Sequence, residues 1–418
     1  MSTSVLGSYL PSLRTLFKWI ASTLAVSLAT GGTALYLLQT RLIYPANLPA
    51  GSRTNVPKPE DFGMPGEEID LVSPDGVKIK AYVIRAGQGY EPSARPTVLL
   101  LHANAGNVGH RLPIAKVFWS KMGCNVVALS YRGRVLQGHY TDGPTRSYGR
   151  SEGSPNEKGI KLDAQTALDY VLSNSELEKT PIFLYGQSIG GAVAIHLASQ
   201  NAQRVCGLII ENTFLSLPQL VPRILPFLAP FVPFLLHQIW PSDQAISTLP
   251  AEFPVLFLAG SRDELVEPSQ MKGLWARCSS KVKEWREFPH GTHNDTCVQP
   301  HYFAHVATFI SQHTDLADVN FSQHAPSQQT DPPAAQAAAA SEPVSAHSTA
   351  PGSPSASSSS AASDGGSSSF EFIEASTEEL RQQQEEADGL VGAGSLGPKE
   401  EAREVLHEAK SELRRQKL

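Results

Sequence analysis

The stretch that decides the fold is Pro181-Ile-Phe-Leu-Tyr-Gly-Gln-Ser-Ile-Gly-Gly-Ala-Val-Ala-Ile-His-Leu-Ala198. Residues 181–185 form an apolar run typical of a strand that is buried on both faces, and residues 191–198 have the composition of a buried helix. Gly186 and Gly190 flank Ser188 at equal spacing. Glycine allows the chain to turn sharply from strand to helix, so Ser188 is expected to project from this turn.

Short apolar runs alternate with stretches of helical period from about residue 68 to residue 312, which is the pattern of crossover units on a largely parallel sheet. The expected strands are 77–85, 97–102, 126–131, 182–186, 205–211, 255–260 and 282–288, and the expected helices include 158–172 and 190–199. A serine at a sharp strand-to-helix turn in such a sheet predicts an α/β-hydrolase fold with flanking helices.

A serine hydroxyl is a weak nucleophile at neutral pH, so Ser188 requires a base and a group that orients the base. In this fold the acid is expected before the histidine along the chain. Asp263 follows the apolar run 255–260 and is the expected acid. Its neighbour Glu264 is the alternative, and Asp243 is less suited because it lies in a proline-rich part of the chain.

The expected base is His293, in the loop that follows the run 282–288. Gly291 permits a bend that directs the imidazole towards the serine. His290 in the same loop is the alternative base, whereas His102 and His301 are interpreted as structural.

The oxyanion of an acyl-transfer intermediate requires N–H donors. One donor is expected from the backbone of Ile189, directly after the serine, and the second from the loop 102–107. Within that loop Asn104 is the preferred donor and Ala103 is the alternative.

An uncharged run, residues 20–38, lies near the N-terminus between Lys18 and Arg41. It has the length that crosses a bilayer core as a helix, which is roughly 20 residues. Because it exceeds the roughly 7–15 residues of a signal-peptide core, we interpret it as a transmembrane anchor with a short flank (1–19) and a linker (39–67). The lipid bilayer is therefore an expected partner, and basic residues on both sides leave the orientation open.

Five prolines interrupt an otherwise apolar stretch between Phe214 and Trp240. Proline excludes long regular helices there. We interpret residues 214–248 as a lid over the site, with contact to a membrane surface left open.

Beyond residue 312 the composition changes to Ala, Ser, Pro and Gln, and then to a charged tract. Such a segment cannot bury enough apolar surface to fold, so residues 313–418 are expected to be a disordered tail. This tail is a candidate binding site for protein partners, and residues 68–312 are assigned to the catalytic domain.

The composition excludes several classes of function. The net charge of −6 provides no basic field for nucleic acid. The four cysteines are too scattered for a disulfide framework or a metal site, so neither a metal nor a cofactor is expected.

Further motifs accompany these residues: Tyr44-Pro45, His102-Ala-Asn-Ala-Gly-Asn107, Tyr131-Arg-Gly133, Ser151-Glu-Gly-Ser-Pro155, Glu211-Asn-Thr-Phe214 and Gly291-Thr-His-Asn-Asp-Thr296. With them, roughly residues 15–312 resemble the bud-emergence-type membrane-anchored α/β-hydrolases of fungi, a family similar to the animal α/β-hydrolase domain-containing protein 13. The resemblance implies a triad of Ser188, Asp263 and His293. It also implies an activity similar to that of serine esterases and acyl-protein thioesterases.

The chain departs from this family at two places. The family usually has glycine at the position of Ala103, where a methyl group would strain the loop if the backbone required a positive φ. The family motif Tyr-Arg-Gly-Tyr-Gly-x-Ser-Glu-Gly is interrupted here by residues 134–147. We interpret them as an inserted loop, either a retained intron, which is favoured, or a lineage-specific loop.

These observations predict a membrane-anchored serine hydrolase that cleaves acyl ester or thioester bonds of lipidic or acylated substrates through an acyl-Ser188 intermediate. The alternative is a membrane-tethered adaptor in cell polarity or trafficking, with or without catalysis, because fold alone does not determine function. The expected location is a single-pass position in the endomembrane system, the endoplasmic reticulum above all, or in the plasma membrane.

Overall fold

The computed structural model describes residues 12–45, 52, 56–87, 91–104, 106–133 and 151–321, with the backbone alone for 315–321. The expected inserted loop lies outside the described residues. Of the expected disordered tail, 313–418, residues 313–321 instead continue the last helix, and the rest lies outside the described residues. Within the described part, an eight-stranded sheet has the order β1-β2-β4-β3-β5-β6-β7-β8. Its strands are β1 Gly66–Val72, β2 Lys78–Ile84, β3 Thr97–Leu101, β4 Asn125–Ser130, β5 Ile182–Gln187, β6 Gly207–Glu211, β7 Val255–Gly260 and β8 Lys283–Phe288.

The sheet is largely parallel, as expected. β2 is antiparallel to both β1 and β4, whereas all neighbouring strands from β4 to β8 are parallel. The seven strands expected from the sequence are present as β2 to β8. β1 was not expected, because Glu67, Glu68 and Asp70 interrupt its apolar residues; they lie on an edge strand that is only partly covered.

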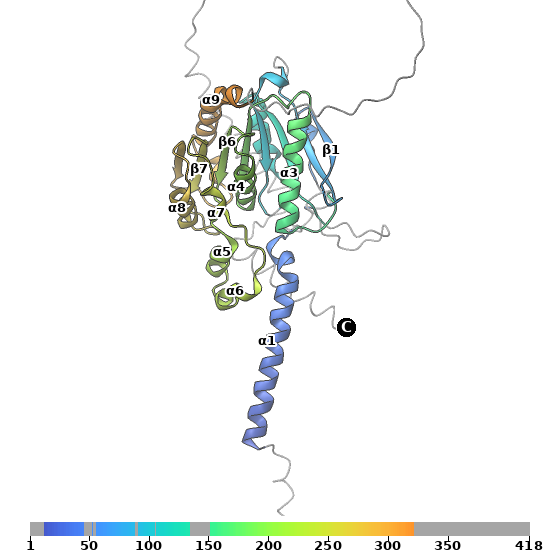
Figure 1. The fold of residues 1–418 in the computed structure, drawn as a ribbon, viewed down its shortest axis with the longest axis vertical. Helices are drawn as coiled ribbons and strands as arrows, with labels where there is room; N and C mark the ends of the chain where they lie inside the picture. Colours follow the sequence, from blue (N-terminus) through green and yellow to red (C-terminus); the bar gives the residue numbers. More distant parts are fainter. Residues whose placement is uncertain are drawn as a thin grey trace, which may run out of the picture.

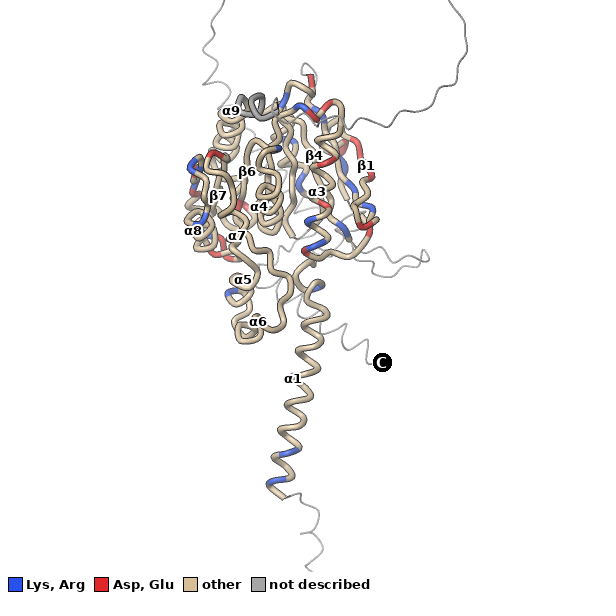
Figure 2. Tube along the Cα trace, viewed as in Figure 1, with Lys and Arg blue, Asp and Glu red and all other residues tan. Residues whose placement is uncertain are grey.

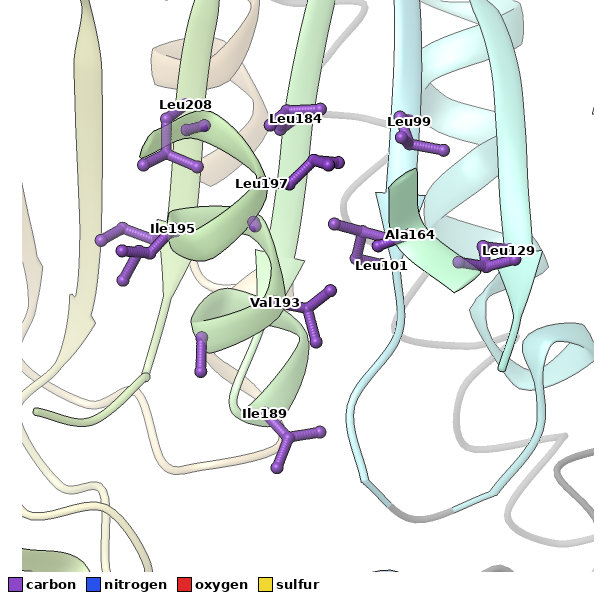
Figure 3. Packing of buried hydrophobic residues seen from close by; sticks show 14 of the residues in the cluster. Leu99, Leu101, Leu129, Ala164, Leu184, Ile189, Val193, Ile195, Leu197 and Leu208 are labelled. Atoms are coloured by element: carbon purple, nitrogen blue, oxygen red, sulfur yellow. The ribbon is translucent and has the colours of Figure 1, made fainter. Parts of the chain in front are cut away.

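Helices cover both faces of the sheet (Figure 1). α3 (Glu157–Ser173), α4 (Ile189–Asn201) and α8 (Pro268–Arg277) pack on one face, and α2 (Leu112–Ser120) and α9 (Tyr302–Phe321) pack on the other. Side chains of successive strand residues point to opposite faces, so the central strands contribute to two separate cores. Figure 3 shows the first of them, which includes Leu101 and Leu184 of the sheet and Val193 and Leu197 of α4.

The described ends of the interrupted family motif lie side by side. The N–H of Gly133 donates to the carbonyl oxygen of Glu152 at 2.8 Å, and the hydroxyl of Ser151 donates to the carbonyl oxygen of Ser130 at 2.8 Å. Arg132 is held by a buried ion pair with Asp163 of α3, with an N–O distance of 2.8 Å. The described parts of the motif, residues 131–133 and 151–153, are therefore neighbours in space although residues 134–150 lie between them in the chain.

One long helix, α1 (Leu13–Ile43), projects from the body (Figure 1). It contains the expected span 20–38 and continues beyond it at both ends. By length and composition it is, among the described helices, the one that could cross a membrane. Figure 2 shows charged residues over the body, whereas the middle of α1 carries none.

Residues 214–248 form the proline-rich segment. Its middle part lies near the end of α1 that adjoins the body (Figure 1). The segment contains α5 (Leu217–Ile224), η5 (Pro226–Phe231), α6 (Val232–Leu235) and α7 (Ser242–Ile246). The longest of these has eight residues, which confirms the expectation that proline excludes long helices here. The remaining short 3-10 turns are η2 Pro59–Phe62, η3 Pro92–Ala94, η4 Val108–Arg111 and η6 Thr296–Val298.

Candidate active site

Ser188 lies between β5 and α4, at a backbone conformation that is uncommon for a residue with a side chain, with φ 54° and ψ −122°. Such a conformation costs of the order of 1–3 kcal/mol and persists only where the surroundings impose it. Glycine is required at positions 186 and 190, two residues before and after Ser188, because a side chain there would clash with the backbone. A Cβ at Gly186 would lie 2.2 Å from the carbonyl oxygen of Gly190, and a Cβ at Gly190 would lie 2.0 Å from that of Leu101.

His293, in the loop after β8, contacts the serine. Its Nε2 lies 3.1 Å from Ser188 Oγ, and its Nδ1 lies 2.8 Å from Asp263 Oδ2. A carboxylate can only accept a hydrogen bond, so Nδ1 carries the proton and Nε2 is left to accept from the serine hydroxyl. All three side chains are buried, and the geometry is that of a hydroxyl beside a base whose tautomer is fixed.

Asp263, in the loop after β7, is itself held in place. Its Oδ1 accepts the backbone N–H groups of Leu265 at 2.9 Å and of Val266 at 2.7 Å, which leaves Oδ2 directed at His293. The alternative acid, Glu264, accepts instead the backbone N–H of His293 at 3.3 Å. Glu264 therefore contacts the main chain of the histidine rather than its ring.

The remaining candidates from the sequence lie away from this cluster. His290 and His301 are exposed, and Asp243 accepts from Gln219 within the proline-rich segment. His102 is fully buried, and burial lowers its pKa to about 3. Its Nδ1 lies 2.7 Å from the carbonyl oxygen of Ala103, so the neutral ring donates to the loop beside the serine.

The expected oxyanion donors meet at one place. α4 begins at Ile189, whose N–H has no carbonyl one turn earlier in the helix and whose position at a helix N-terminus favours an anion. Ala103 and Asn104 line the same cavity as Ser188. Ala103 is not among the described residues with positive φ, so its methyl group does not strain the loop in the way that the family comparison suggested. The side-chain amide of Asn104 donates to the carbonyl oxygen of Ile43, at the end of α1.

A cavity of about 380 Å³ opens beside Ser188 and His293. Apart from the polar groups of the site, its walls are mainly aliphatic and aromatic side chains of α1 and of the proline-rich segment. Pockets of this size and character bind apolar ligands and orient them through a few polar groups. Among the residues that the structure describes, no cluster of His, Cys, Asp and Glu could hold a metal ion.

Comparison with known proteins places this chain in a family. Residues 92–250 match the family described as "Serine aminopeptidase, S33". Protein bem46 of Schizosaccharomyces pombe is 44% identical over 291 residues, which cover 70% of this chain and 91% of that protein. This chain belongs to the bem46 family of α/β-hydrolases.

Other members extend the comparison. The uncharacterized membrane protein YNL320W of Saccharomyces cerevisiae is 38% identical over 68% of this chain and 92% of its own length. The α/β-hydrolase domain-containing protein WAV2 of Arabidopsis thaliana is 35% identical over 64% and 84%, respectively. A solved esterase of Pyrococcus furiosus, Pf2001, shares the fold with a TM-score of 0.50 and 20% identity over 62% of this chain and 94% of its own. Family membership supports a hydrolase, and α1 together with the likeness to a membrane protein supports membrane association.

In this bem46 family member, Asn212 connects the two loops that carry the acid and the base, a role that we did not predict. It follows β6 with φ 44°, a left-handed conformation that asparagine tolerates better than most residues. Its Nδ2 donates to the carbonyl oxygens of Thr292 at 3.0 Å and His293 at 3.3 Å, while its Oδ1 accepts the N–H of Gly260 at 2.8 Å. The sequence signal was present in the motif Glu211-Asn-Thr-Phe214, which directly follows a buried strand.

A buried polar network lies beneath the bem46-family site. Glu211 accepts hydrogen bonds from the hydroxyls of Tyr185 at 2.7 Å and Tyr302 at 2.6 Å, and burial raises its pKa. Gln187 donates to Glu211 and to the carbonyl oxygen of His293, each at 3.2 Å. The histidine loop is thus hydrogen-bonded to the sheet by two side-chain amides, those of Asn212 and Gln187.

Proposed function

We propose that this bem46 family member is a membrane-anchored serine hydrolase that cleaves acyl ester or thioester bonds, with Ser188, His293 and Asp263 as its triad. The observation that carries the proposal is the continuous hydrogen-bonded path from Asp263 through His293 to Ser188. The apolar cavity beside the serine supports an acyl group as the part of the substrate that is bound.

In the proposed reaction, Ser188 Oγ forms a bond to the acyl carbonyl carbon while His293 Nε2 takes the hydroxyl proton. The negative charge on the carbonyl oxygen is stabilised by the N–H of Ile189 and by an N–H of the loop at Ala103 and Asn104. The bond to the leaving alcohol or thiol then breaks, and His293 returns the proton to it. Water adds to the acyl-Ser188 ester in the same manner and releases the carboxylic acid.

Asp263 supports this cycle by accepting a hydrogen bond from the Nδ1–H group of His293 and by stabilising the imidazolium that forms in each half-reaction. Because both oxygens of Asp263 are engaged by hydrogen bonds, the ring is held in one orientation. We further propose that the chain crosses the membrane once through α1, in the endomembrane system or the plasma membrane.

The test is covalent labelling of the full-length protein in a membrane fraction with a fluorophosphonate, which reacts with activated serines. We expect labelling of the wild type and none of Ser188→Ala. Ser261→Ala is the matched control, because the Ser261 hydroxyl donates to Glu287 and lies outside the proposed path. A wild type that is not labelled, or a Ser188→Ala variant labelled as strongly, would overturn the proposal.

A further inference from the structure

The cavity beside Ser188 is bounded by α1 as well as by the catalytic body. Leu35, Gln39 and Leu42 of α1 line it together with Ser188. They face residues of the proline-rich segment, so the cavity lies between two apolar elements that are far apart in the sequence. A helix that served only as a tether would have no part in this wall.

The contact between these two elements extends along α1 into its uncharged run. A Cβ at Gly32 would lie 3.8 Å from Cδ2 of Leu235, at the end of α6. Gly32 lies nine residues before Arg41, the first charge towards the catalytic body, or about 13 Å along the helix. If α1 crosses a bilayer, α6 therefore lies well inside the hydrocarbon region.

Gln39, two residues before Arg41, hydrogen-bonds the irregular backbone of the segment where it meets the end of α1. It is 6% exposed, its Nε2 donates to the carbonyl oxygen of Leu235 at 2.8 Å, and its Oε1 accepts the N–H of His237 at 2.9 Å. Non-helical backbone within a membrane is tolerated only where protein groups satisfy its hydrogen bonds. A polar side chain in an apolar helix is costly in a membrane unless it is hydrogen-bonded. These bonds therefore indicate that Gln39 holds α1 and the proline-rich segment together.

The outer surface of the proline-rich segment has the chemistry of a membrane-facing surface. Phe227, Phe231 and Phe234 are exposed, with Phe234 81% exposed, and Figure 2 shows few charges on this part of the molecule. Its cation, Arg223, is neutralised by Glu267 at 2.7 Å. The neighbouring helix α1 also carries exposed apolar side chains, among them Leu24, Leu28 and Leu37.

We infer that the proline-rich segment is immersed in the bilayer beside α1, and that the two form the passage through which the acyl chain of a bilayer ester lipid reaches Ser188. The anchor helix is then part of the substrate site. The substrate arrives laterally from the lipid phase, and chain length is selected by Leu35 and the side chains opposite it. The substrate part of this inference rests on the proposed hydrolase activity, whereas the immersion of the segment does not.

Immersion is tested without turnover. The four native cysteines are buried, so an environment-sensitive nitrobenzoxadiazole label can be attached selectively to Phe234→Cys in the full chain in phosphatidylcholine vesicles. We expect doxyl-labelled lipid to quench this label as strongly as one at Leu28→Cys in α1. A label at Ser311→Cys should not be quenched, because α9 lies at the end of the body away from α1 (Figure 1). Quenching at residue 234 as weak as at residue 311 would overturn the immersion.

The passage is tested by chain length. Leu35→Trp should reduce kcat/KM for 4-methylumbelliferyl oleate at least tenfold, because excluding two methylenes from an apolar site costs about fourfold each. Hydrolysis of the butyrate ester should change by less than about twofold. Leu37→Trp is the matched control, since Leu37 is 68% exposed and does not line the cavity.

An equal effect of Leu35→Trp on both esters, or no effect on either, overturns the passage. Failure of the proposed function would give a different result in the hydrolysis assay. In that case Ser188→Ala retains the wild-type hydrolysis of both esters, whatever the quenching at residue 234 shows.

Discussion

Ser188 stands between two regions that are held together by different forces. On the side of the sheet, the loops of Asp263 and His293 are fixed by directional hydrogen bonds, and Asn212 joins them. On the side of α1, the proline-rich segment and α1 meet mainly through apolar surfaces, with Gln39 as the principal polar link. Hydrogen bonds fix angles and distances closely, whereas apolar contacts constrain mainly volume. Substitutions on the first side should therefore change the rate for every substrate, and those on the second should change which substrates are accepted.

The largest effect is expected from Asp263→Asn. Asparagine can donate to Nδ1 and so stabilises the wrong tautomer of His293, which lowers kcat by about 10⁴-fold in triads of this type. The loss should be the same for short and long esters. Glu264→Gln is the control and should stay within about threefold, because Glu264 contacts only the backbone of His293. A larger loss of kcat in Glu264→Gln than in Asp263→Asn would show that Glu264, not Asp263, is the acid.

Asn212→Ala should have an intermediate effect on the same side. It removes the donor to the carbonyl oxygens of Thr292 and His293, and a small displacement of a reacting group costs about 10²-fold in kcat. We expect KM to change by less than about threefold for both esters. Asn201→Ala removes a buried amide far from the site and controls for general loss of stability. A lower melting temperature with unchanged kcat would contradict the positioning role.

Gln39→Ala should act on the contact between α1 and the proline-rich segment and should affect the two esters differently. It leaves the backbone groups of Leu235 and His237 without their partner, which costs about 1–3 kcal/mol locally. Amide hydrogen exchange in the peptide containing His237 and Gln238 should therefore accelerate about tenfold, and hydrolysis of the oleate ester should fall more than that of the butyrate. Thr23→Ala is the control, because the Thr23 hydroxyl donates only within α1. Unchanged exchange would show that Gln39 does not hold the segment.

The smallest effect concerns the loop beside the serine. The pKa of His102 is lowered to about 3 by burial, against roughly 6.5 in an unfolded chain. The unfolded chain therefore binds a proton that the folded chain does not, so stability falls as pH decreases below about 6.5. His102→Gln keeps a donor for Ala103 but does not titrate. Between pH 6 and pH 5 the wild type should lose about 2–4 °C more in melting temperature than the variant. Equal losses would mean that this ring is protonated in the folded state.

The sheet side of the site could be predicted from the sequence because its signals are local. The run before Ser188, the glycines beside it and the order of Asp263 and His293 all lie within short segments, and the structure brings these residues together. Asn212 was missed because its role depends on two loops that are 48 and 80 residues away. A single residue after a strand does not reveal which loops will close over it.

The contact between α1 and the proline-rich segment could not be predicted to the same degree. Apolar residues recur throughout α1 and the proline-rich segment, so no pattern indicates which of them touch. The one specific signal was Gln39, a polar residue that directly follows the expected span 20–38 and that we assigned to the linker. Edge strand β1 was missed because its charged residues break the apolar pattern of a strand. Such charges are tolerated only where a strand is exposed.

The hydrogen bond between Gly133 and Glu152 makes the connection between these two residues a suitable place for inserting another domain. The two ends of the intervening chain meet just after β4, so the body is closed whether the connection is short or long, and closure cost rises only slowly with length. A small reporter domain whose termini lie close together could replace residues 134–147 without disturbing Arg132 or α3.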